Sequence, residues 1–573
     1  MIVLSVEQQE IVELPLQPLA VTACAGSGKT MTAVHRLAAM RRLHDDAHGL
    51  VVLLSFSNVA VDTFRREYVT SVRNQEATLR SFAVEIDTMD GFITANVLRS
   101  HGHRVMECGR TPYLVDGREP FLKSFTVWDG KRSHLTSDIN INIENNAFSY
   151  SVGQNQQPLS PAEAVSKLVK LGKTGAYTHA SARYWVLRVL REHPFVLRAL
   201  ARRYPHILVD EAQDIGPEHQ AILELLVSQG SQLSLIGDPH QGIYEFAHAN
   251  GAFLATYGQR AGVLEKYLSI NYRSVPSILA VANKLCGRDD SADRSELPGK
   301  HGAYYFAFKK TEREKALATF QSILVAVGIN SKRGAVLCRS TDWASRWSGE
   351  QDGQGQGVIR CFANAAINRD QLKRLPEAYA QSCLGIVGLL ASEHGNVMSQ
   401  LARTSRREMN QLRRMIWSFV RDMDHGLPSA ALVADSEWHP KLCDRARKLV
   451  AKLESEFGLK SGENLGQKLA KRALENRPLA QIPDLAQPEM PQFRVSTVHK
   501  VKGESLQAVM YVADKKHVRE LLDGTGSEVG RIGYVAVTRA EDLFVLAVPD
   551  SCFGEFESEL QAKGLRRAGT TAC

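Results

Sequence analysis

Short apolar runs alternate with polar turns and longer amphipathic stretches over residues 19–60 and again over residues 204–275. Runs such as Leu50–Leu54 have the length of a buried strand, whereas the stretches between the runs have the apolar spacing of helices. Strands that alternate with helices predict parallel α/β layers. A third block continues the pattern, with a strand, a helix and a strand expected at Ala303–Phe308, Glu312–Val327 and Ala335–Cys338.

Two segments break this pattern. Between Ser124 and Val152 apolar and polar residues alternate around the turn Asp129-Gly130, which predicts a small β-ribbon. The segment between a glycine-rich stretch near residue 355 and a proline-rich linker near residue 485 is predicted to be mostly helical. One helix is expected from Leu442 to Phe457, with Gly458 placed to end it. The pattern therefore predicts two α/β domains, each interrupted by an insertion.

Size and composition restrict the class of protein. A chain of 573 residues is too long for one core and suggests about three or four domains. The nine cysteines contain no Cys-x-x-Cys pair, which argues against a disulfide framework, a zinc ribbon or an iron–sulfur cluster. No apolar run could span a membrane and no signal-peptide pattern is visible, so we expect a cytoplasmic protein with no membrane partner. The net charge of +8 suits a polyanionic partner.

A candidate phosphate-binding loop follows the first predicted strand. The segment Ala23-Cys24-Ala25-Gly26-Ser27-Gly28-Lys29-Thr30 lies between a strand and a helix. Small residues let backbone N–H groups close around phosphates at a helix N-terminus, where Lys29 can reach the outer phosphates and Thr30 can bind Mg²⁺. The alternative is a chance glycine turn before a helix, which the strand–loop–helix context disfavours.

Two carboxylates end a second buried strand. The run Ile207-Leu208-Val209 leads directly into Asp210 and Glu211. Asp210 is then placed to bind the metal ion, and Glu211 to orient and deprotonate the attacking water. Taken alone, an Asp-Glu pair is often a solvated strand end. Together with the phosphate-binding loop, the pair predicts Mg²⁺-dependent nucleotide hydrolysis.

Further segments occur in the order typical of the UvrD/Rep group of superfamily 1 helicases, which the chain resembles from residue 4 to about residue 548. The segments that carry the resemblance are Leu4-Ser5-Val6-Glu7-Gln8, Ser55-Phe56-Ser57-Asn58, Thr88-Met89-Asp90-Gly91-Phe92, Gly237-Asp238-Pro239-His240-Gln241, Asn271-Tyr272-Arg273-Ser274, Thr497-Val498-His499-Lys500 and Tyr534-Val535-Ala536-Val537-Thr538-Arg539. The resemblance implies an α/β fold of two RecA-like parallel-sheet motor domains, each with a largely helical insertion. The implied domains are residues 1–91 and 195–275 (first motor domain), 92–194 (its insertion), 276–350 and 490–573 (second motor domain) and 351–489 (its helical insertion).

The resemblance also implies roles for single residues. Gln8 would read the base of ATP and Tyr272 would stack on it. Gln241, Arg273 and Arg539 would complete the catalytic site, with both arginines reaching the γ-phosphate when the cleft between the motor domains closes. These residues join the loop residues Ala25, Gly26, Ser27, Gly28, Lys29 and Thr30 in the expected nucleotide site. Taken singly, each arginine could instead form a surface salt bridge, and Tyr272 could be a packed core residue.

The resemblance implies single-stranded DNA as the partner. Contacts to DNA are implied for Phe56, Ser57, Asn58, Thr88, Tyr244, Phe246, Thr497 and His499. Stacking of an aromatic side chain on a base is worth about 1–3 kcal/mol, which offsets the melting of about one base pair. For each aromatic residue, core packing is the alternative interpretation.

Two segments depart from the family pattern. Ala247-His248-Ala249 stands where the family usually has Arg-Gly-Ala, and in Lys502-Gly503-Glu504-Ser505 the acidic residue stands one position early. With the short helical insertion, these features are most similar to the GajB-type helicase subunits of Gabija anti-phage defence systems, which act beside an OLD-family nuclease. An arginine-rich stretch from Arg403 to Arg421 could bind duplex DNA or a partner protein, or be a solvated helix face.

The sequence thus predicts an ATP-dependent DNA helicase or translocase that moves 3′ to 5′ on single-stranded DNA and acts at duplex junctions or ends. The alternative is a DNA-end-sensing ATPase subunit that regulates a partner nuclease with little unwinding of its own. A structural protein with a relic site is disfavoured, because every phosphate-contacting residue type is present.

Overall fold

The computed structural model describes residues 4–44, 49–73, 84–115, 119–144, 147–153, 155–244, 251–297, 301–348, 354–391, 407–480 and 493–568. The chain divides into two compact units. One comprises Met1–Val115, Phe125–Trp347 and Pro491–Cys573, and the other comprises Asp116–Ser124 and Ser348–Met490. The first unit contains two six-stranded sheets, and the second is built mainly of helices.

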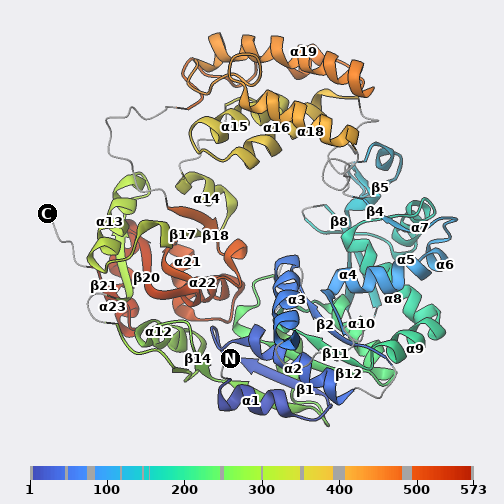
Figure 1. The fold of residues 1–573 in the computed structure, drawn as a ribbon, viewed down its shortest axis with the longest axis vertical. Coiled ribbons are helices and arrows are strands. Elements are labelled where there is room, and N and C mark those ends of the chain that lie inside the picture. Colours follow the sequence, from blue (N-terminus) through green and yellow to red (C-terminus); the bar gives the residue numbers. More distant parts are fainter. Residues whose placement is uncertain are drawn as a thin grey trace. The chain divides into compact units, whose positions relative to one another are not determined.

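Six parallel strands form the first sheet, in the order β13-β1-β12-β11-β2-β3. Figure 1 labels four of them, β1, β2, β11 and β12. The strands are β1 (Leu19–Ala23), β2 (Val51–Ser55), β3 (Val84–Thr88), β11 (His206–Val209), β12 (Gln232–Gly237) and β13 (Leu264–Leu268). Alternate residues of β2 enter different cores, Val51 and Leu53 on one face and Val52 and Leu54 on the other. Helices cover both faces, which explains why the strands are nearly continuous apolar runs.

Two groups of helices supply these cores. One face packs against α1 (Val6–Glu13), α2 (Lys29–Leu43) and α3 (Asn58–Arg73). The opposite face packs against α8 (His179–Glu192), α10 (Pro217–Ser228) and α11 (Ala252–Tyr257). Arg36 of α2 is fully buried and donates hydrogen bonds to the carbonyls of Val12 (3.3 Å) and Pro15 (2.8 Å). Because these carbonyls lie at the end of α1 and just beyond it, the arginine fixes α1 against α2.

The predicted β-ribbon is confirmed as two small antiparallel sheets. Strands β5 (Thr126–Trp128) and β6 (Ser133–Leu135) pair across the predicted turn. Asp129 stabilises that turn, because its Oδ1 accepts hydrogen bonds from the backbone N–H groups of Lys131 and Arg132, each 2.7 Å long. The second sheet contains β7 (Ile139–Glu144), β8 (Ala147–Val152) and β9 (Gln157–Pro158).

The second six-stranded sheet is also parallel, with the strand order β18-β17-β19-β20-β16-β21. Its strands are β16 (Gly302–Phe308), β17 (Gly334–Cys338), β18 (Arg494–Thr497), β19 (Leu506–Val512), β20 (Ala540–Pro549) and β21 (Arg566–Arg567). One face packs on α12 (Pro276–Cys286), α21 (Lys515–Asp523), α22 (Glu528–Arg539) and α23 (Phe553–Ala562), and the other on α13 (Arg313–Ala326) and α14 (Thr341–Ser348). The expected strand, helix and strand of the third block are therefore confirmed, as is the fold class of two parallel α/β layers.

The second unit is a helical domain with its own core. Its main helices are α15 (Gly357–Asp370), α16 (Leu375–Leu389), α18 (Arg407–Arg421) and α19 (His439–Phe457). Arg369 is buried and donates to the carbonyls of Val420 (2.8 Å), Leu427 (2.6 Å) and Pro428 (3.1 Å), so it binds carbonyls at the end of α18 and beyond it. The predicted helix before Gly458 is confirmed as α19, and Gly458 ends it with a φ of 66°.

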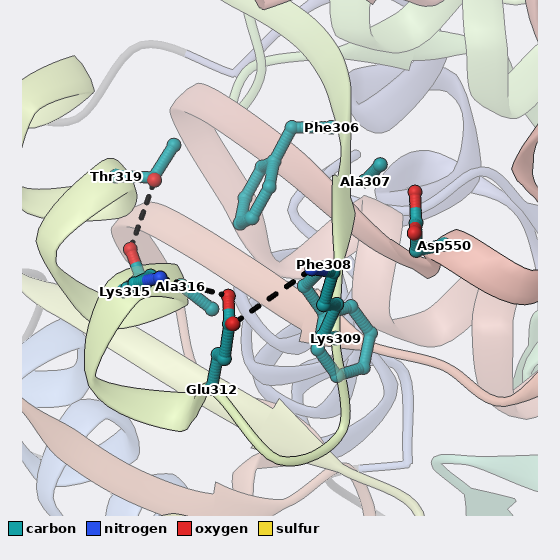
Figure 2. A pocket seen from close by; sticks show the side chains of 9 residues that line it. All are labelled: Phe306, Ala307, Phe308, Lys309, Glu312, Lys315, Ala316, Thr319 and Asp550. Atoms are coloured by element: carbon teal, nitrogen blue, oxygen red, sulfur yellow. Dashed lines mark hydrogen bonds and ion pairs between the residues drawn. The ribbon is translucent and has the colours of Figure 1, made fainter.

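A small cavity of about 210 Å³ lies where β16 ends (Figure 2). Two lysines line it, but both form ion pairs with Glu312, Lys309 at 3.8 Å and Lys315 at 3.2 Å. Glu312 and Asp550 in the lining balance the two lysines, so the cavity has no excess positive charge and is a poor phosphate site. Among the described helices, none is both long and apolar enough to cross a membrane.

Candidate functional site

The predicted phosphate-binding loop connects β1 to α2, as its sequence requires. Gly26 and Gly28 have φ angles of 72° and 77°, which residues with a side chain rarely adopt. A Cβ atom on Gly26 would lie 2.7 Å from Cβ of Arg273, and one on Gly28 would lie 2.7 Å from Nε2 of Gln8. Glycine is therefore needed at both positions for conformation and for space, and the loop touches two other predicted site residues.

Lys29 lies in this loop with little solvent contact, since it is 9% exposed. Its Nζ donates to the carbonyl of Cys24 over 3.4 Å, a long hydrogen bond. The Ser27 hydroxyl donates to the same carbonyl over 2.8 Å and so closes the loop. A buried ammonium with one weak acceptor in the described part of the chain is suited to an anionic ligand.

Gln8 is fixed against the loop by the first helix. Ser5 and Gln8 form a capping box at the start of α1, in which the Gln8 Oε1 accepts from the Ser5 backbone N–H (3.0 Å). The Gln8 Nε2 donates to the carbonyl of Ser27 (3.0 Å). The amide predicted to read the base therefore lies at the edge of the phosphate-binding loop and is 1% exposed.

Asp210 and Glu211 follow β11 directly. Asp210 is 2% exposed, and its Oδ1 has no hydrogen-bond partner among the described residues. Burial and the neighbouring Glu211 raise the pKa of the Asp210 carboxyl. Burial also acts to raise the pKa of Glu211, but Lys502 and Lys29 outweigh it and lower that pKa. Glu211 has a φ of 53°, a strained conformation of a kind that clusters at functional sites.

This carboxylate arrangement fits a magnesium ion that arrives with a nucleotide. No cluster of three or more His, Cys, Asp or Glu side chains that could hold a metal is found in the described part of the chain. Mg²⁺ usually takes one or two protein ligands and completes its shell with water and phosphate oxygens. The unpaired Asp210 Oδ1 is a suitable ligand of this kind, and Thr30 lies in the first turn of α2.

Gln241 follows β12 of the first sheet, Arg539 ends a helix that packs on the second sheet, and the two side chains meet. The Gln241 Nε2 donates to Asp238 Oδ2 (2.7 Å), which fixes its amide at the end of β12. The Gln241 Oε1 accepts from Arg539 Nη2 (3.1 Å), and Arg539 is the last residue of α22. Arg539 is 2% exposed, and its Nε has no partner among the described residues. Burial and the nearby Arg273 lower the pKa of Arg539 to about 9, so an anion between the two guanidiniums would relieve an unfavourable arrangement.

Arg273 is held by both sheet domains, that is, by the parts of the chain built on the first and on the second six-stranded sheet. Asn271 donates from Nδ2 to the carbonyl of Ala25 (2.6 Å) and accepts from the backbone N–H of Arg273 (2.9 Å). The Arg273 Nε donates to the Ser505 hydroxyl (2.8 Å), and its Nη1 donates to the carbonyl of Thr538 (2.9 Å). Its guanidinium therefore lies between the loop and the segments around Ser505 and Thr538.

A cavity of about 460 Å³ opens beside these groups, within the range of ligand pockets. Its lining residues are Gly26, Gly28, Tyr272, Arg273, Arg294, Ser505 and Glu541. Tyr272 reaches it because its backbone N–H donates to the carbonyl of Gly26 (3.0 Å). The loop glycines, the aromatic ring and an arginine are thus brought to one cavity.

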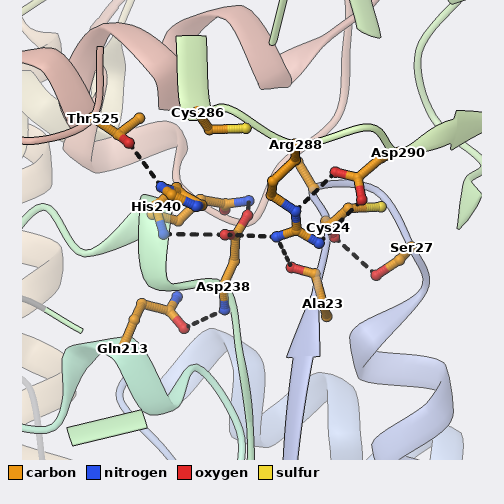
Figure 3. A network of polar contacts seen from close by, with 12 residues as sticks. Ala23, Cys24, Ser27, Gln213, Asp238, His240, Cys286, Arg288, Asp290 and Thr525 are labelled. Atoms are coloured by element: carbon orange, nitrogen blue, oxygen red, sulfur yellow. Dashed lines mark hydrogen bonds and ion pairs between the residues drawn. The ribbon is translucent and has the colours of Figure 1, made fainter. Parts of the chain in front are cut away.

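A network centred on Arg288 lies at the end of β1 (Figure 3). Arg288 donates from Nη1 to the carbonyl of Ala23 (3.4 Å) and lies 3.6 Å from Asp238 Oδ1. Its Nη2 donates to Asp290 Oδ1 (3.1 Å). Sequence reasoning missed Arg288, because no motif marks it. Asp238 is completely buried between Arg288 and Gln241, so Arg288 is linked to the amide that contacts Arg539.

Sequence reasoning also missed the ion pair between Lys502 and Asp214. The Lys502 Nζ lies 2.7 and 2.6 Å from the two carboxylate oxygens, and both side chains are less than a tenth exposed. The Lys502 Nζ also lies 4.9 Å from the ring centre of Tyr244. Lys502 stands in a segment that departs from the family pattern, and Asp214 lies shortly after the Asp210-Glu211 pair, but nothing in the sequence shows that the two residues pair.

The predicted DNA contacts are brought together only in part. Phe56 packs edge-on against His219, with ring centres 5.7 Å apart, and Ser57 and Asn58 beside it are exposed. Thr88 is near them, because its neighbour across the sheet is Ser55. Tyr244 lies 5.8 Å from the ring of His499, which donates to the carbonyl of Ile243 (3.0 Å).

Two further residues were predicted to contact DNA. Thr497 is 5% exposed. Phe246, with the departing segment Ala247-His248-Ala249, lies outside the described residues.

Residues 4–260 match the family described as the UvrD/REP helicase N-terminal domain. The chain is UvrD-like over this region. The match covers the whole first sheet except its edge strand β13, and it includes Gln8, the phosphate-binding loop, Asp210, Glu211 and Gln241.

Named relatives extend the similarity. "DNA helicase II" of Haemophilus influenzae is 25% identical over 368 residues, 58% of this chain and 48% of the relative. "ATP-dependent DNA helicase UvrD1" of Mycobacterium tuberculosis is 26% identical over 334 residues, 52% of this chain and 41% of the relative. "ATP-dependent DNA helicase UvrD2" of the same organism is 24% identical over 312 residues, 49% of this chain and 42% of the relative. The chain thus spans about half the length, or less, of the curated relatives it matches.

Proposed function

We propose that this UvrD-like chain is a DNA-dependent ATPase that translocates on single-stranded DNA and unwinds duplexes. The observation that carries the proposal is the 3.1 Å hydrogen bond between Gln241 and Arg539. It joins the two sheet domains beside Lys29 and Asp210, so that one nucleotide could contact both domains. The names of the relatives, which are DNA helicases, support the same activity.

In the proposed site, Lys29 binds the outer phosphates and the loop N–H groups surround them. Asp210 and Thr30 hold Mg²⁺, which would neutralise charge on the phosphates. Glu211 accepts the proton of the water that attacks the γ-phosphorus, for which its lowered pKa keeps it ionised. Arg273 and Arg539 stabilise the charge that develops as the bond to ADP breaks.

Movement follows from the same contacts in this proposal. Because Arg273 and Arg539 are tied to the second sheet domain, loss of the γ-phosphate removes a ligand that both domains share. The domains would then separate and rejoin once per ATP, which shifts the grip on DNA at Phe56, Thr88, Tyr244 and His499. We further propose 3′ to 5′ movement and the division into motor domains and insertions described above, both from family likeness.

The biological setting is a separate proposal. Likeness to GajB-type subunits suggests an anti-phage complex in the cytoplasm with an OLD-family nuclease as partner. Only the departures at Ala247 and Ser505 and the short insertion support it. Copurification of the native complex, followed by identification of its members, tests this setting without affecting the proposed ATPase activity.

The ATPase proposal is tested by steady-state hydrolysis with and without single-stranded DNA. We expect DNA to stimulate hydrolysis, and Lys29→Ala and Arg539→Ala each to lower kcat by about 10³-fold or more. Arg333→Ala is a matched control, because Arg333 is exposed on the second sheet domain. Normal turnover by either site variant, with the fold intact by circular dichroism, would contradict the site.

Strand displacement tests what the hydrolysis drives. We expect duplexes with a 3′ single-stranded tail to be unwound and those with a 5′ tail to remain paired. Hydrolysis that DNA stimulates without any unwinding would exclude the helicase and favour the end-sensing ATPase. Hydrolysis indifferent to DNA would exclude both.

A further inference from the structure

The cavity beside the phosphate-binding loop has one carboxylate, that of Glu541, in its lining. Glu541 is the second residue of β20 and is half-buried. Among the described residues, its carboxylate forms neither a hydrogen bond nor an ion pair, although Arg273 is near. Burial lowers the pKa of Arg273, and Glu541 is the foremost of the charges that act to raise it. A carboxylate in this position has acceptor capacity to spare.

The other charged group at this end of the cavity is already paired. Arg294 donates from Nη2 to Asp542 Oδ1 (2.6 Å) and from Nη1 to the backbone carbonyl of Glu541 (3.3 Å). The Ser505 hydroxyl accepts from Arg273 Nε. Glu541 is thus a charged lining group with no hydrogen bond to its side chain among the described residues.

The chemistry of a carboxylate limits what Glu541 can contact. An ionised carboxylate only accepts hydrogen bonds, and it repels phosphate oxygens. In a nucleoside triphosphate, the donors are the ribose hydroxyls and, in adenine, the exocyclic amine. Phosphates belong at Gly26, Gly28 and the arginines, and the base belongs at the ring of Tyr272. The ribose connects these two parts, so its hydroxyls are the donors nearest to a carboxylate beside Arg273.

We propose that Glu541 accepts a hydrogen bond from a ribose hydroxyl of the bound nucleotide, so that the affinity of the site depends on that hydroxyl. The inference rests on the proposed nucleotide site. In dinucleotide-binding folds, a carboxylate side chain forms hydrogen bonds with the ribose of the bound dinucleotide. Ser505 leaves room for it, because the short side chain points its hydroxyl at Arg273 instead of filling the cavity.

Equilibrium binding tests the proposal without catalysis. Titration calorimetry on the full chain would compare ADP, 2′-deoxy-ADP and 3′-deoxy-ADP in the presence of Mg²⁺. A hydrogen bond to a charged acceptor corresponds to about a ten-fold change in Kd. We therefore expect the wild-type protein to bind at least one deoxy analogue about ten-fold more weakly than ADP. Glu541→Ala should weaken the binding of ADP about ten-fold, so that all three nucleotides bind with similar Kd values. Glu541→Gln should restore part of the preference for ADP.

Glu163→Gln is the matched control, since Glu163 is an exposed residue of α7 (Pro161–Gly172) and should leave all three Kd values unchanged. Equal Kd values for all three nucleotides in the wild-type protein would overturn the proposal, and this measurement does not require a variant. The same ratios in Glu541→Ala as in the wild type would overturn it as well. Failure of ADP itself to bind would instead contradict the proposed nucleotide site.

Discussion

The side chain of Asp210 is almost fully buried, and its Oδ1 atom has no hydrogen-bond partner among the described residues. A buried, incompletely paired carboxylate destabilises a fold, because its charged form loses hydration. The pKa of Asp210 is raised because this loss of hydration disfavours the charged form of its carboxyl. The proposed metal ion would offset it, which is the pattern expected where function and stability conflict at one residue.

Asp210→Asn should therefore stabilise the nucleotide-free protein while it abolishes hydrolysis. A folded-state pKa above the unfolded value means that stability falls as the pH rises from about 4 through the folded pKa. The gain in the variant should be largest above that range, at about 1 kcal/mol or more. Thermal melting at pH 9 and at pH 5, without Mg²⁺ or nucleotide, measures it. A variant less stable than the wild type at both pH values would contradict the argument.

Three elements of the first sheet domain are joined by one carboxylate. Asp90 lies in α4 (Met89–Ile93), directly after β3. It accepts two hydrogen bonds from Arg183 of α8 (2.9 and 2.8 Å) and one from His219 of α10 (2.9 Å). His219 in turn packs against Phe56. This clamp fixes the segment that carries Thr88 and orients an aromatic side chain proposed to face DNA.

Asp90→Asn is expected to loosen this clamp in a pH-dependent way. Burial acts to raise the pKa of Asp90, but Arg183 and His219 outweigh it and hold the pKa well below its usual range. With a depressed folded pKa, the stabilisation is complete above about pH 4 and is lost as the pH falls further. The loss in the variant should be about 2 kcal/mol at pH 7, reduced from the value for a fully buried pair because the Asp90 side chain is 34% exposed.

Urea unfolding between pH 7 and pH 3 checks this expectation. The difference between variant and wild type should shrink below about pH 4. Asp138→Asn serves as the control, because Asp138 is exposed and should show no such difference. A difference that stays constant with pH would show that the Asp90 charge is not what stabilises the clamp.

Helices, strands and turns were predictable where the sequence pattern that specifies them is local. The apolar run at β2, the helix α19 with Gly458 after it, and the turn at Asp129 each depend on neighbours within a few residues. The pairing of side chains from distant segments was not predictable, because no local pattern encodes it. Lys502 and Asp214 are 288 residues apart, and Arg183 and Asp90 are 93 apart. The nucleotide-binding residues were predicted from short sequence motifs, whereas Arg288 and Glu541 lie outside these motifs.

At the scale of the whole sheet-containing unit, a few buried polar contacts connect the two sheet domains. Besides Gln241 with Arg539, the Arg531 Nε donates to the carbonyl of Gly242 (2.6 Å), and His499 donates to the carbonyl of Ile243 (3.0 Å). The segment after β12 therefore makes repeated contacts with the second domain. The pair Lys502–Asp214 is the one salt bridge between these domains with both side chains less than a tenth exposed among the described residues.

Removing one partner of this pair should be costly, because it leaves the other charge buried and unpaired. Burial raises the pKa of Asp214 to about 6, against the opposing effect of Lys502, so its charged form depends on that lysine. We expect Lys502→Met and Asp214→Leu each to destabilise the protein by about 3–5 kcal/mol. The double variant should recover much of this loss, since an apolar pair of similar size replaces the ion pair without an unpaired charge.

Thermal melting of the four proteins gives the coupling between the two positions, which should exceed about 1 kcal/mol in favour of the double variant. Lys500→Met is the control, because Lys500 is exposed in the same short helix η11 (His499–Val501) and should leave the melting temperature unchanged. Additive losses in the double variant would mean that the two side chains stabilise their own domains separately. Recovery in the double variant would locate the stabilisation in the contact itself, and so in the junction that brings Arg539 to Gln241.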